Sequence, residues 1–299
     1  MLQLRNIRKA YTTGSFTQTA LDDVSISFRD SEFVAILGPS GSGKTTLLNI
    51  IGGLDHYDTG DLVIDGISTK EYKDRDWDTF RNNRIGFVFQ AYNLIPHQTI
   101  LANVELALTL SGVSRAERRT RALDALRKVG LGDHVDKKPS QLSGGQMQRL
   151  TLMMAYLSDK PIIILDEPTA GQDAESLKRC AELIREMGKE KTVLIITHDL
   201  ELIADACDRC IGLSGGQAET DFFIRSQQDL QAVRRYIERF HPTKVSPPKQ
   251  YNERFHPATK LLYWLVLTIV ISTSDNHLVY AAYAALMLLT AADGRLTAA

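Results

Sequence analysis

Residues Gly38-Pro-Ser-Gly-Ser-Gly-Lys-Thr45 combine three glycines with a lysine and a threonine. They follow a strand-like apolar run, Phe33–Leu37, and open a helical stretch. Glycines let backbone N–H groups wrap a phosphate without side-chain clash, and a helix start adds positive potential. Lys44 would bridge the β- and γ-phosphates of a nucleotide, and Thr45 would give its hydroxyl to Mg²⁺. A plain glycine-rich turn explains the context less well. The predicted nucleotide-binding residues here are Gly38, Pro39, Ser40, Gly41, Ser42, Gly43, Lys44, Thr45 and Thr46.

Two adjacent carboxylates, Asp166 and Glu167, follow a second apolar run at residues 162–165. Buried strands seldom end in two acids unless something cationic lies beside them. Asp166 is the expected Mg²⁺ ligand, and Glu167 can orient or deprotonate an attacking water. A strand that ends at a solvated edge would explain one of the two acids. It does not explain well why both occur in a chain that also carries a phosphate-binding loop.

A third motif, Leu142-Ser-Gly-Gly-Gln146, precedes a helical pattern that carries Leu150. With the other motifs in this order, it resembles the signature of ABC ATPases, and the resemblance covers residues 1 to about 220. In that family the signature closes the ATP held by a second ATPase domain, its glycine amides and helix start acting as an anion nest. The resemblance implies a head-to-tail dimer that hydrolyses ATP. The residues it assigns to this contact are Ser143, Gly144, Gly145 and Gln146.

The same resemblance gives roles to four positions that carry little signal alone. Gln90 is similar to the glutamine that senses Mg²⁺ and contacts the membrane subunit. His198 matches the histidine that contacts the γ-phosphate and the attacking water. Asp173 falls in the loop between subunits, and Tyr11 resembles the aromatic residue that stacks on adenine. The implied catalytic set is Lys44, Gln90, Glu167 and His198, and the implied metal set is Thr45, Gln90 and Asp166.

Residues Leu213-Ser-Gly-Gly-Gln217 repeat the signature letter for letter. No helix with an apolar face follows within a few residues, and no Asp-Glu strand follows at all. Gly215 and Gly216 lie between two strand-like runs, which predicts a hairpin turn and not a second phosphate site. Cys207 and Cys210 form a lone CxxC, for which a helix-to-strand junction is expected over a metal or redox role.

The elements that must position these residues follow from periodicity. Residues 1–37 alternate like strands, and from Lys44 to about residue 215 strand-like runs alternate with helical patterns, which predicts an α/β domain with a parallel sheet. The family resemblance implies a P-loop NTPase domain with an N-terminal antiparallel β-subdomain and a helical subdomain at about 91–157. The expected domains are residues 1–225 for nucleotide binding, 226–257 for a helix and linker, and 258–299 for a hydrophobic segment.

The hydrophobic segment holds two apolar runs, residues 261–271 and 278–292. Each is shorter than the about 20 residues of a perpendicular membrane span, so a short membrane hairpin is favoured over a docking hairpin. Four basic residues before the first run would keep that end cytoplasmic. The start of the chain lacks a signal-peptide pattern, and the cytoplasmic face of the cell membrane is the expected location. The basic residues are Lys244, Lys249, Arg254 and Lys260.

The two halves resemble different relatives. Phe87-Val-Phe-Gln-Ala-Tyr-Asn-Leu-Ile-Pro96 is similar to the lipoprotein and macrolide exporter group. Residues 152–157 and 170–173 are closer to energy-coupling-factor (ECF) importers, and residues 256–299 resemble the start of the ECF transmembrane T component. We therefore expect a hybrid joined near residues 141–149, for which a natural fusion and a cloning artefact both stay open.

Other function classes fit less well. The net charge of -1 gives no electrostatic case for nucleic acid, and three cysteines cannot build a disulfide framework. The alternative function is a non-transport ABC ATPase of the DNA-repair or translation type. The first would need a coiled coil between Lys44 and Ser143, and the second would need two ATPase domains. The expected partners are a second ABC ATPase domain and a transmembrane permease, with the membrane and no nucleic acid. The expected cofactors are ATP and Mg²⁺.

Overall fold

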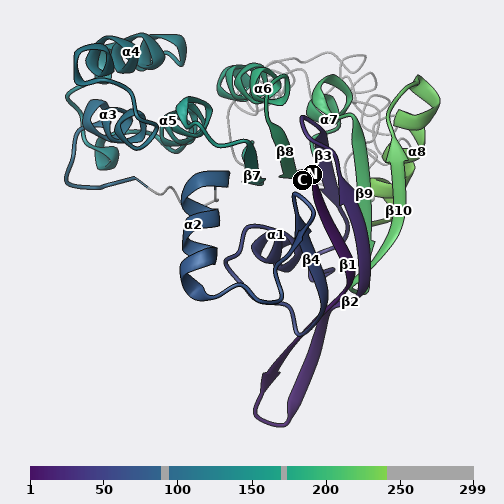
Figure 1. The fold of residues 1–299 in the computed structure, drawn as a ribbon. Coiled ribbons are helices and arrows are strands. Elements are labelled where there is room, and N and C mark those ends of the chain that lie inside the picture. Colours follow the sequence, from purple (N-terminus) through teal and green to yellow (C-terminus); the bar gives the residue numbers. More distant parts are fainter. Residues whose placement is uncertain (89–93, 170–173, 241–299) are drawn as a thin grey trace, which may run out of the picture. The chain divides into compact units, whose positions relative to one another are not determined.

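A computed structural model describes residues 1–88, 94–169 and 174–240, which lie within one compact unit, Met1–Pro242. Its centre is a six-stranded sheet with the order β10-β9-β3-β8-β7-β6 (Figure 1). Neighbouring strands run parallel except β9 and β10. The strands are β3 (Phe33–Leu37), β6 (Ile85–Val88), β7 (Ile162–Asp166), β8 (Thr192–Ile196), β9 (Arg209–Ser214) and β10 (Gln217–Phe223).

The apolar strands of this sheet divide two hydrophobic cores. In β3, Ala35 and Leu37 enter one core, whereas Val34 and Ile36 enter the other. Strand β7 divides its isoleucines in the same way. Side chains alternate between the two faces of a strand, so a continuous apolar run is required where both faces are covered. Covering both faces holds the strand ends, and the motifs that follow them, in fixed positions.

A second, antiparallel sheet has the order β2-β1-β4-β5. The hairpin of β1 and β2 is long and extends away from the core sheet (Figure 1), and Phe16 at its turn is 66% exposed. The apolar side chains at the other end of the hairpin pack into the core that also covers α1. The strands are β1 (Leu2–Thr13), β2 (Phe16–Phe28), β4 (Thr59–Ile64) and β5 (Ile67–Ser68).

The helices α3, α4 and α5 lie together at one side of the core sheet (Figure 1). Among the described residues, no helix is both long and apolar enough to cross a membrane. The predicted hydrophobic hairpin at 258–299 lies outside those residues. The helices are α1 (Lys44–Ile51), α2 (Asp74–Arg84), α3 (Ile100–Leu110), α4 (Arg115–Lys128), α5 (Gly144–Leu157), α6 (Ala174–Gly188), α7 (Leu200–Ala206) and α8 (Gln227–Phe240), with short 3-10 turns at Gly132–His134 and Pro139–Gln141.

Candidate functional site

The glycine-rich loop leads from the carboxyl end of β3 into the first turn of α1, as the sequence predicts. Gly43 caps the helix with a φ of 96°, a backbone conformation that L side chains rarely adopt. A Cβ there would also lie 2.3 Å from the carbonyl oxygen of Ala20, and a Cβ on Gly38 would lie 2.2 Å from that of Leu213. The loop is thus packed against two other backbone segments, so larger residues are excluded at both glycines.

Lys44 is half-buried inside this loop. Its Nζ donates hydrogen bonds to the carbonyl oxygens of Gly38 and Pro39, each at 2.8 Å. Burial lowers the pKa of Lys44, and the negative charges of Glu167 and Asp166 oppose that shift. The lysine therefore shares one electrostatic environment with the two acids, although they are far from it in the sequence.

The acids stand at the carboxyl end of β7. Burial raises the pKa of Asp166, while Lys44 and the Thr45 hydroxyl lower it. Burial and the neighbouring charge of Asp166 raise the pKa of Glu167 to about 7, against the opposing effect of Lys44. Glu167 has a φ of 48°, and its backbone N–H donates to the Ile196 carbonyl at 3.0 Å. That hydrogen bond ties the acid to the neighbouring strand β8.

His198 follows β8 and lies beside the second acid. Its Nε2 is 3.3 Å from Oε1 of Glu167, and both side chains are about one-third exposed. The two strands pair in register, with Asp166 opposite Ile196, so their carboxyl ends meet at one edge of the sheet. Open parallel sheets bind ligands at this edge. The structure thus brings together four residues that were predicted from the sequence: Lys44, Asp166, Glu167 and His198.

A hollow of about 310 Å³ opens beside the loop. Tyr11 lines it from β1, facing the same space as Lys44, Thr45 and Thr46. Tyr11 is 42% exposed, so it is accessible to a ligand in the hollow. Besides these, the residues that line the hollow are Gln18, Ala20, Ser40, Gly41 and Gly43.

The signature motif forms the start of α5. The Ser143 hydroxyl accepts a hydrogen bond from the Gln146 N–H at 3.3 Å, and the Gln146 side chain accepts one from the Ser143 N–H at 2.9 Å. This reciprocal cap fixes the first turn of the helix. Ser143 and Gly144 are exposed, and no residue of the motif lines the hollow at the phosphate loop of the same chain.

A family model described as ABC transporter matches residues 21–170. The chain belongs to the ABC transporter family. An uncharacterized ABC transporter ATP-binding protein of Methanocaldococcus jannaschii, MJ0796, is 41% identical over 235 residues, 77% of this chain and 100% of that protein. The macrolide export ATP-binding/permease protein MacB of Burkholderia pseudomallei is 40% identical over 222 residues, 74% of this chain and 34% of MacB. A dimeric structure of MJ0796 in a post-hydrolysis state, bound to ADP and Pi, superposes with a TM-score of 0.69 at 40% identity, covering 76% of this chain and 100% of that one.

The chain is therefore an ABC ATPase, an ATP-binding and ATP-hydrolysing subunit of a membrane transporter. The predicted fold and the predicted function are confirmed, and the non-transport alternative is not favoured. The ECF-type features of the second half stay predictions.

The second copy of the signature in this ABC ATPase is a turn. Strands β9 and β10 pair with Ser214 opposite Gln217, which leaves Gly215 and Gly216 as a two-residue hairpin loop. Both glycines have positive φ, 55° and 82°, as this tight turn requires. No helix begins there, so the prediction of a hairpin is confirmed.

The CxxC pair behaves as expected for a junction. Cys207 follows α7 and Cys210 lies in β9, and both are buried. Burial raises the pKa of Cys207, and it raises that of Cys210 to about 12, so both thiols are poor nucleophiles.

Two predicted site residues, Gln90 and Asp173, lie outside the described residues. Sequence reasoning in turn missed Lys9 and Asp55, which contact Tyr11. Lys9 carried a usable signal, because it stands two residues before Tyr11 on a predicted strand and so shares its face. Asp55 carried none, since its turn is 44 residues away from Tyr11.

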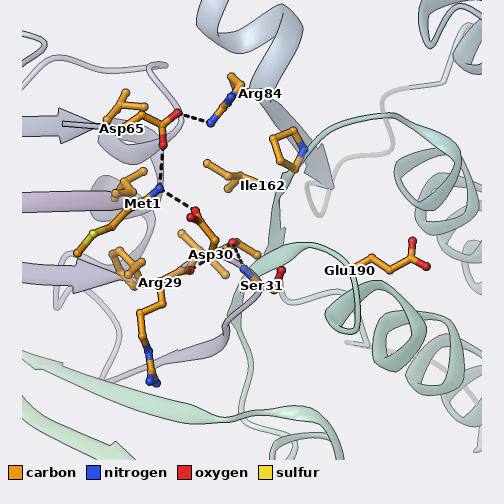
Figure 2. A pocket seen from close by; sticks show the side chains of 14 residues that line it. Met1, Arg29, Asp30, Ser31, Asp65, Arg84, Ile162 and Glu190 are labelled. Atoms are coloured by element: carbon orange, nitrogen blue, oxygen red, sulfur yellow. Dashed lines mark hydrogen bonds and ion pairs between the residues drawn. The ribbon is translucent and has the colours of Figure 1, made fainter. Parts of the chain in front are cut away.

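Another hollow, of about 230 Å³, lies at the opposite end of the core sheet (Figure 2). Ile162 and Thr192, the first residues of β7 and β8, line it. On its rim the amine of Met1 donates to Asp30 at 2.7 Å and to Asp65 at 2.8 Å. No residue of the ATPase motifs lines this hollow, so it is separate from the nucleotide site.

Proposed function

We propose that the chain hydrolyses MgATP in a composite site that it completes with a second ABC ATPase domain. The observation that carries this proposal is the pair Glu167 and His198, 3.3 Å apart, beside the phosphate loop. The relative MJ0796 has a dimeric structure bound to ADP and Pi, which supports a dimer of this kind. Both partners would supply one phosphate loop and one signature.

Lys44 would bind the β- and γ-phosphates, and the amides of residues 38–45 would wrap the β-phosphate. The Thr45 hydroxyl and the Asp166 carboxylate are close enough for one to shift the pKa of the other, and both offer the oxygen atoms that Mg²⁺ prefers. These residues fit the ion, which would neutralise charge on the phosphates. Gln90 would join them as a ligand. Tyr11, in the wall of the same hollow, would stack on adenine.

Glu167 would accept the proton of the attacking water. Burial and the charge of Asp166 raise the pKa of Glu167, so its carboxylate is a stronger base than that of an exposed glutamate. His198 would contact the γ-phosphate and orient the same water, with Glu167 holding its ring. This arrangement supports in-line attack on the γ-phosphate, with its charge balanced by Lys44.

The signature would act on the nucleotide of the partner. Ser143 caps an exposed helix start that carries partial positive charge, and Gly144 and Gly145 place no side chain over it. Gln146 fixes the serine through the cap described above. Asp173, in the loop that follows Asp166 and Glu167 in the sequence, would contact the partner domain. That the motif does not line the hollow of its own chain supports action between chains.

Closure of the dimer would be transmitted to a transmembrane permease through the region of Gln90. We propose residues 1–225 as the nucleotide-binding domain, with the helical subdomain at about 91–157, residues 226–257 as a helix and linker, and residues 258–299 as a membrane hairpin similar to the start of a T component. The chain would lie at the cytoplasmic face of the cell membrane.

The similarity to MacB supports an exporter-like permease, whereas the second half favours an ECF importer. Purification from native membranes would identify the permease, and intact-mass measurement would show whether the hybrid is natural.

The experiment is the substitution Glu167→Gln. We expect ATP binding to remain and steady-state hydrolysis to fall by orders of magnitude, because the base is lost while the phosphate loop is intact. Glu190→Gln is the matched control, because Glu190 lines the hollow at the other end of the sheet. Hydrolysis by Glu167→Gln near the wild-type rate would remove Glu167 from this role.

A further inference from the structure

The hydroxyl of Tyr11 is anchored outside the nucleotide hollow. It donates a hydrogen bond of 2.6 Å to Oδ2 of Asp55, while the ring itself lines the hollow. The phenol oxygen can leave this position only by breaking a charge-assisted hydrogen bond, which is among the stronger kinds in proteins. Asp55, which is not part of the hollow wall, thus holds the phenol end of the ring, and the side chain of Thr46, which does line the hollow, also hydrogen-bonds with Tyr11.

Lys9 adds a second restraint on the same ring. Its Nζ donates to Oδ1 of Asp55 at 2.8 Å and to the carbonyl of His56 at 2.6 Å, and it lies 5.1 Å from the centroid of the Tyr11 ring. The Lys9 side chain is only 12% exposed, so solvent screens this cation little. A buried ammonium at this distance is attracted to the π-face and withdraws electron density from it.

Asp55 is saturated by these contacts. Burial alone would raise the pKa of Asp55, but hydrogen bonds from Lys9, Tyr11 and the backbone of His56 outweigh it and hold the pKa below its usual value. The N–H of Asp55 also donates to the Asn49 carbonyl in the last turn of α1. The backbone of Asp55 is therefore tied to the same helix that begins with Lys44 and Thr45.

Neither Lys9 nor Asp55 lines the hollow, whereas Tyr11 and Thr46 do. A ligand in the hollow would touch the ring and not the two charged residues. This separates them from the phosphate-binding residues, which line the hollow themselves. Tyr11 is the side chain through which Lys9 and Asp55 can both reach such a ligand, and the backbone contact of Asp55 with α1 is a second route that the experiment must separate from it.

We propose that Asp55 and Lys9 are positioning residues that hold the Tyr11 ring in place for the nucleobase and make it a better stacking partner. This inference rests on the proposed role of Tyr11 against adenine. Holding the phenol in advance lowers the entropy lost when the base binds. Lys9 makes the ring electron-poor, which favours stacking with an electron-rich purine.

The test compares two ligands with the same phosphates, ATP and inorganic tripolyphosphate, by calorimetric titration of the full chain. Tyr11→Ala should weaken ATP about tenfold and leave tripolyphosphate unchanged, because only ATP has a base to stack. Asp55→Asn and Lys9→Met should each weaken the binding of ATP about threefold and raise the KM for ATP by the same factor. The affinity for tripolyphosphate and the kcat should stay unchanged. Asp65→Asn is the matched control, since this acid also loses ion pairs but lies at the hollow of Figure 2.

The outcomes separate the two claims. Equal weakening of ATP and tripolyphosphate by Asp55→Asn would overturn the positioning role, because it would mean general damage to the loop. If Tyr11→Ala weakens the binding of ATP but Asp55→Asn and Lys9→Met do not, the positioning role is overturned as well, while the role of Tyr11 stays intact. If Tyr11→Ala does not change the binding of ATP, both the stacking role of Tyr11 and the positioning role are ruled out. Should Asp55→Asn fail to fold, Tyr11→Phe keeps the ring without its anchor and should shift the same ratio of affinities by about threefold; an unchanged ratio would also overturn the inference.

Discussion

Nε2 of His198 lies 3.3 Å from Oε1 of Glu167, at the ends of two strands that pair in register. The Glu167 N–H also bonds the Ile196 carbonyl, two residues before His198. The backbone therefore holds the two residues next to each other at this edge of the sheet. They should act on one water as a unit.

We expect His198→Ala to lower kcat for ATP about a hundredfold or more, because the water and the γ-phosphate lose one contact each. Combined with Glu167→Gln, the loss should be much less than the product of the two, since residues that act as a unit are not additive. Steady-state phosphate release measures this, with the exposed His97→Ala as control. A rate for His198→Ala within a few-fold of wild type would contradict the pairing.

The pKa of Glu167 predicts a pH-dependent stability for the protein without nucleotide. Its value of about 7 exceeds the unfolded value of 4.5, so between these the folded state binds the proton more tightly. The free energy of unfolding should therefore fall as pH rises from about 4.5 to 7, by about 1–3 kcal/mol for this partly exposed group. Glu167→Gln should be more stable than wild type, with a difference that grows across this window and is constant above it. Urea unfolding at several pH values would measure it, and parallel curves would rule the shift out.

Gly43 should tolerate alanine less well than Gly41. Both have positive φ, so alanine costs about 1–2 kcal/mol at either. Only at Gly43 would the new Cβ lie 2.3 Å from the Ala20 carbonyl, which adds about 1–3 kcal/mol, because Gly41 faces open space. Urea unfolding without nucleotide compares the two variants. An equal loss of stability would mean that the loop does not pack on β2 as described.

Ser143→Ala and Ser214→Ala test the two identical pentapeptides. The first removes a helix cap, at a cost of about 0.5–2 kcal/mol, and should lower hydrolysis at least about tenfold. The second changes the residue before a hairpin turn and should leave hydrolysis as it was. Phosphate release from both variants would settle the comparison. Comparable losses would mean that the turn also takes part in the reaction.

The sequence predicts well what is local. The run Phe33–Leu37 before a glycine loop, and the apolar run before Asp166, fix a strand and its following motif, because only strands buried on both faces need such continuity. The two copies of the signature are told apart in the same way, by the helix that follows one of them. The role of His198 came from the family, and its distance from Glu167 needed the pairing of β7 with β8.

The contact of Asp55 with Tyr11 could not be predicted. The register of β1 on β2 shifts between Ile7 and Ala10, and Lys9 and Tyr11, on either side of the last shift, both meet Asp55. Such shifts depend on the twist of the whole hairpin and leave no pattern in the sequence. Asp55 itself is an acid in a turn, which would suit a solvated position equally well.

The central claim is that ATP joins two chains, each closing the site of the other. Light scattering after gel filtration of Glu167→Gln, with and without ATP, tests it most directly, because the variant keeps its ATP. We predict a monomer without ATP and a dimer with it, and a monomer in both conditions when Ser143→Arg is added, although that double variant still binds ATP. A Glu167→Gln chain that stays monomeric with saturating ATP, or a dimer that the signature substitution leaves intact, would contradict the account.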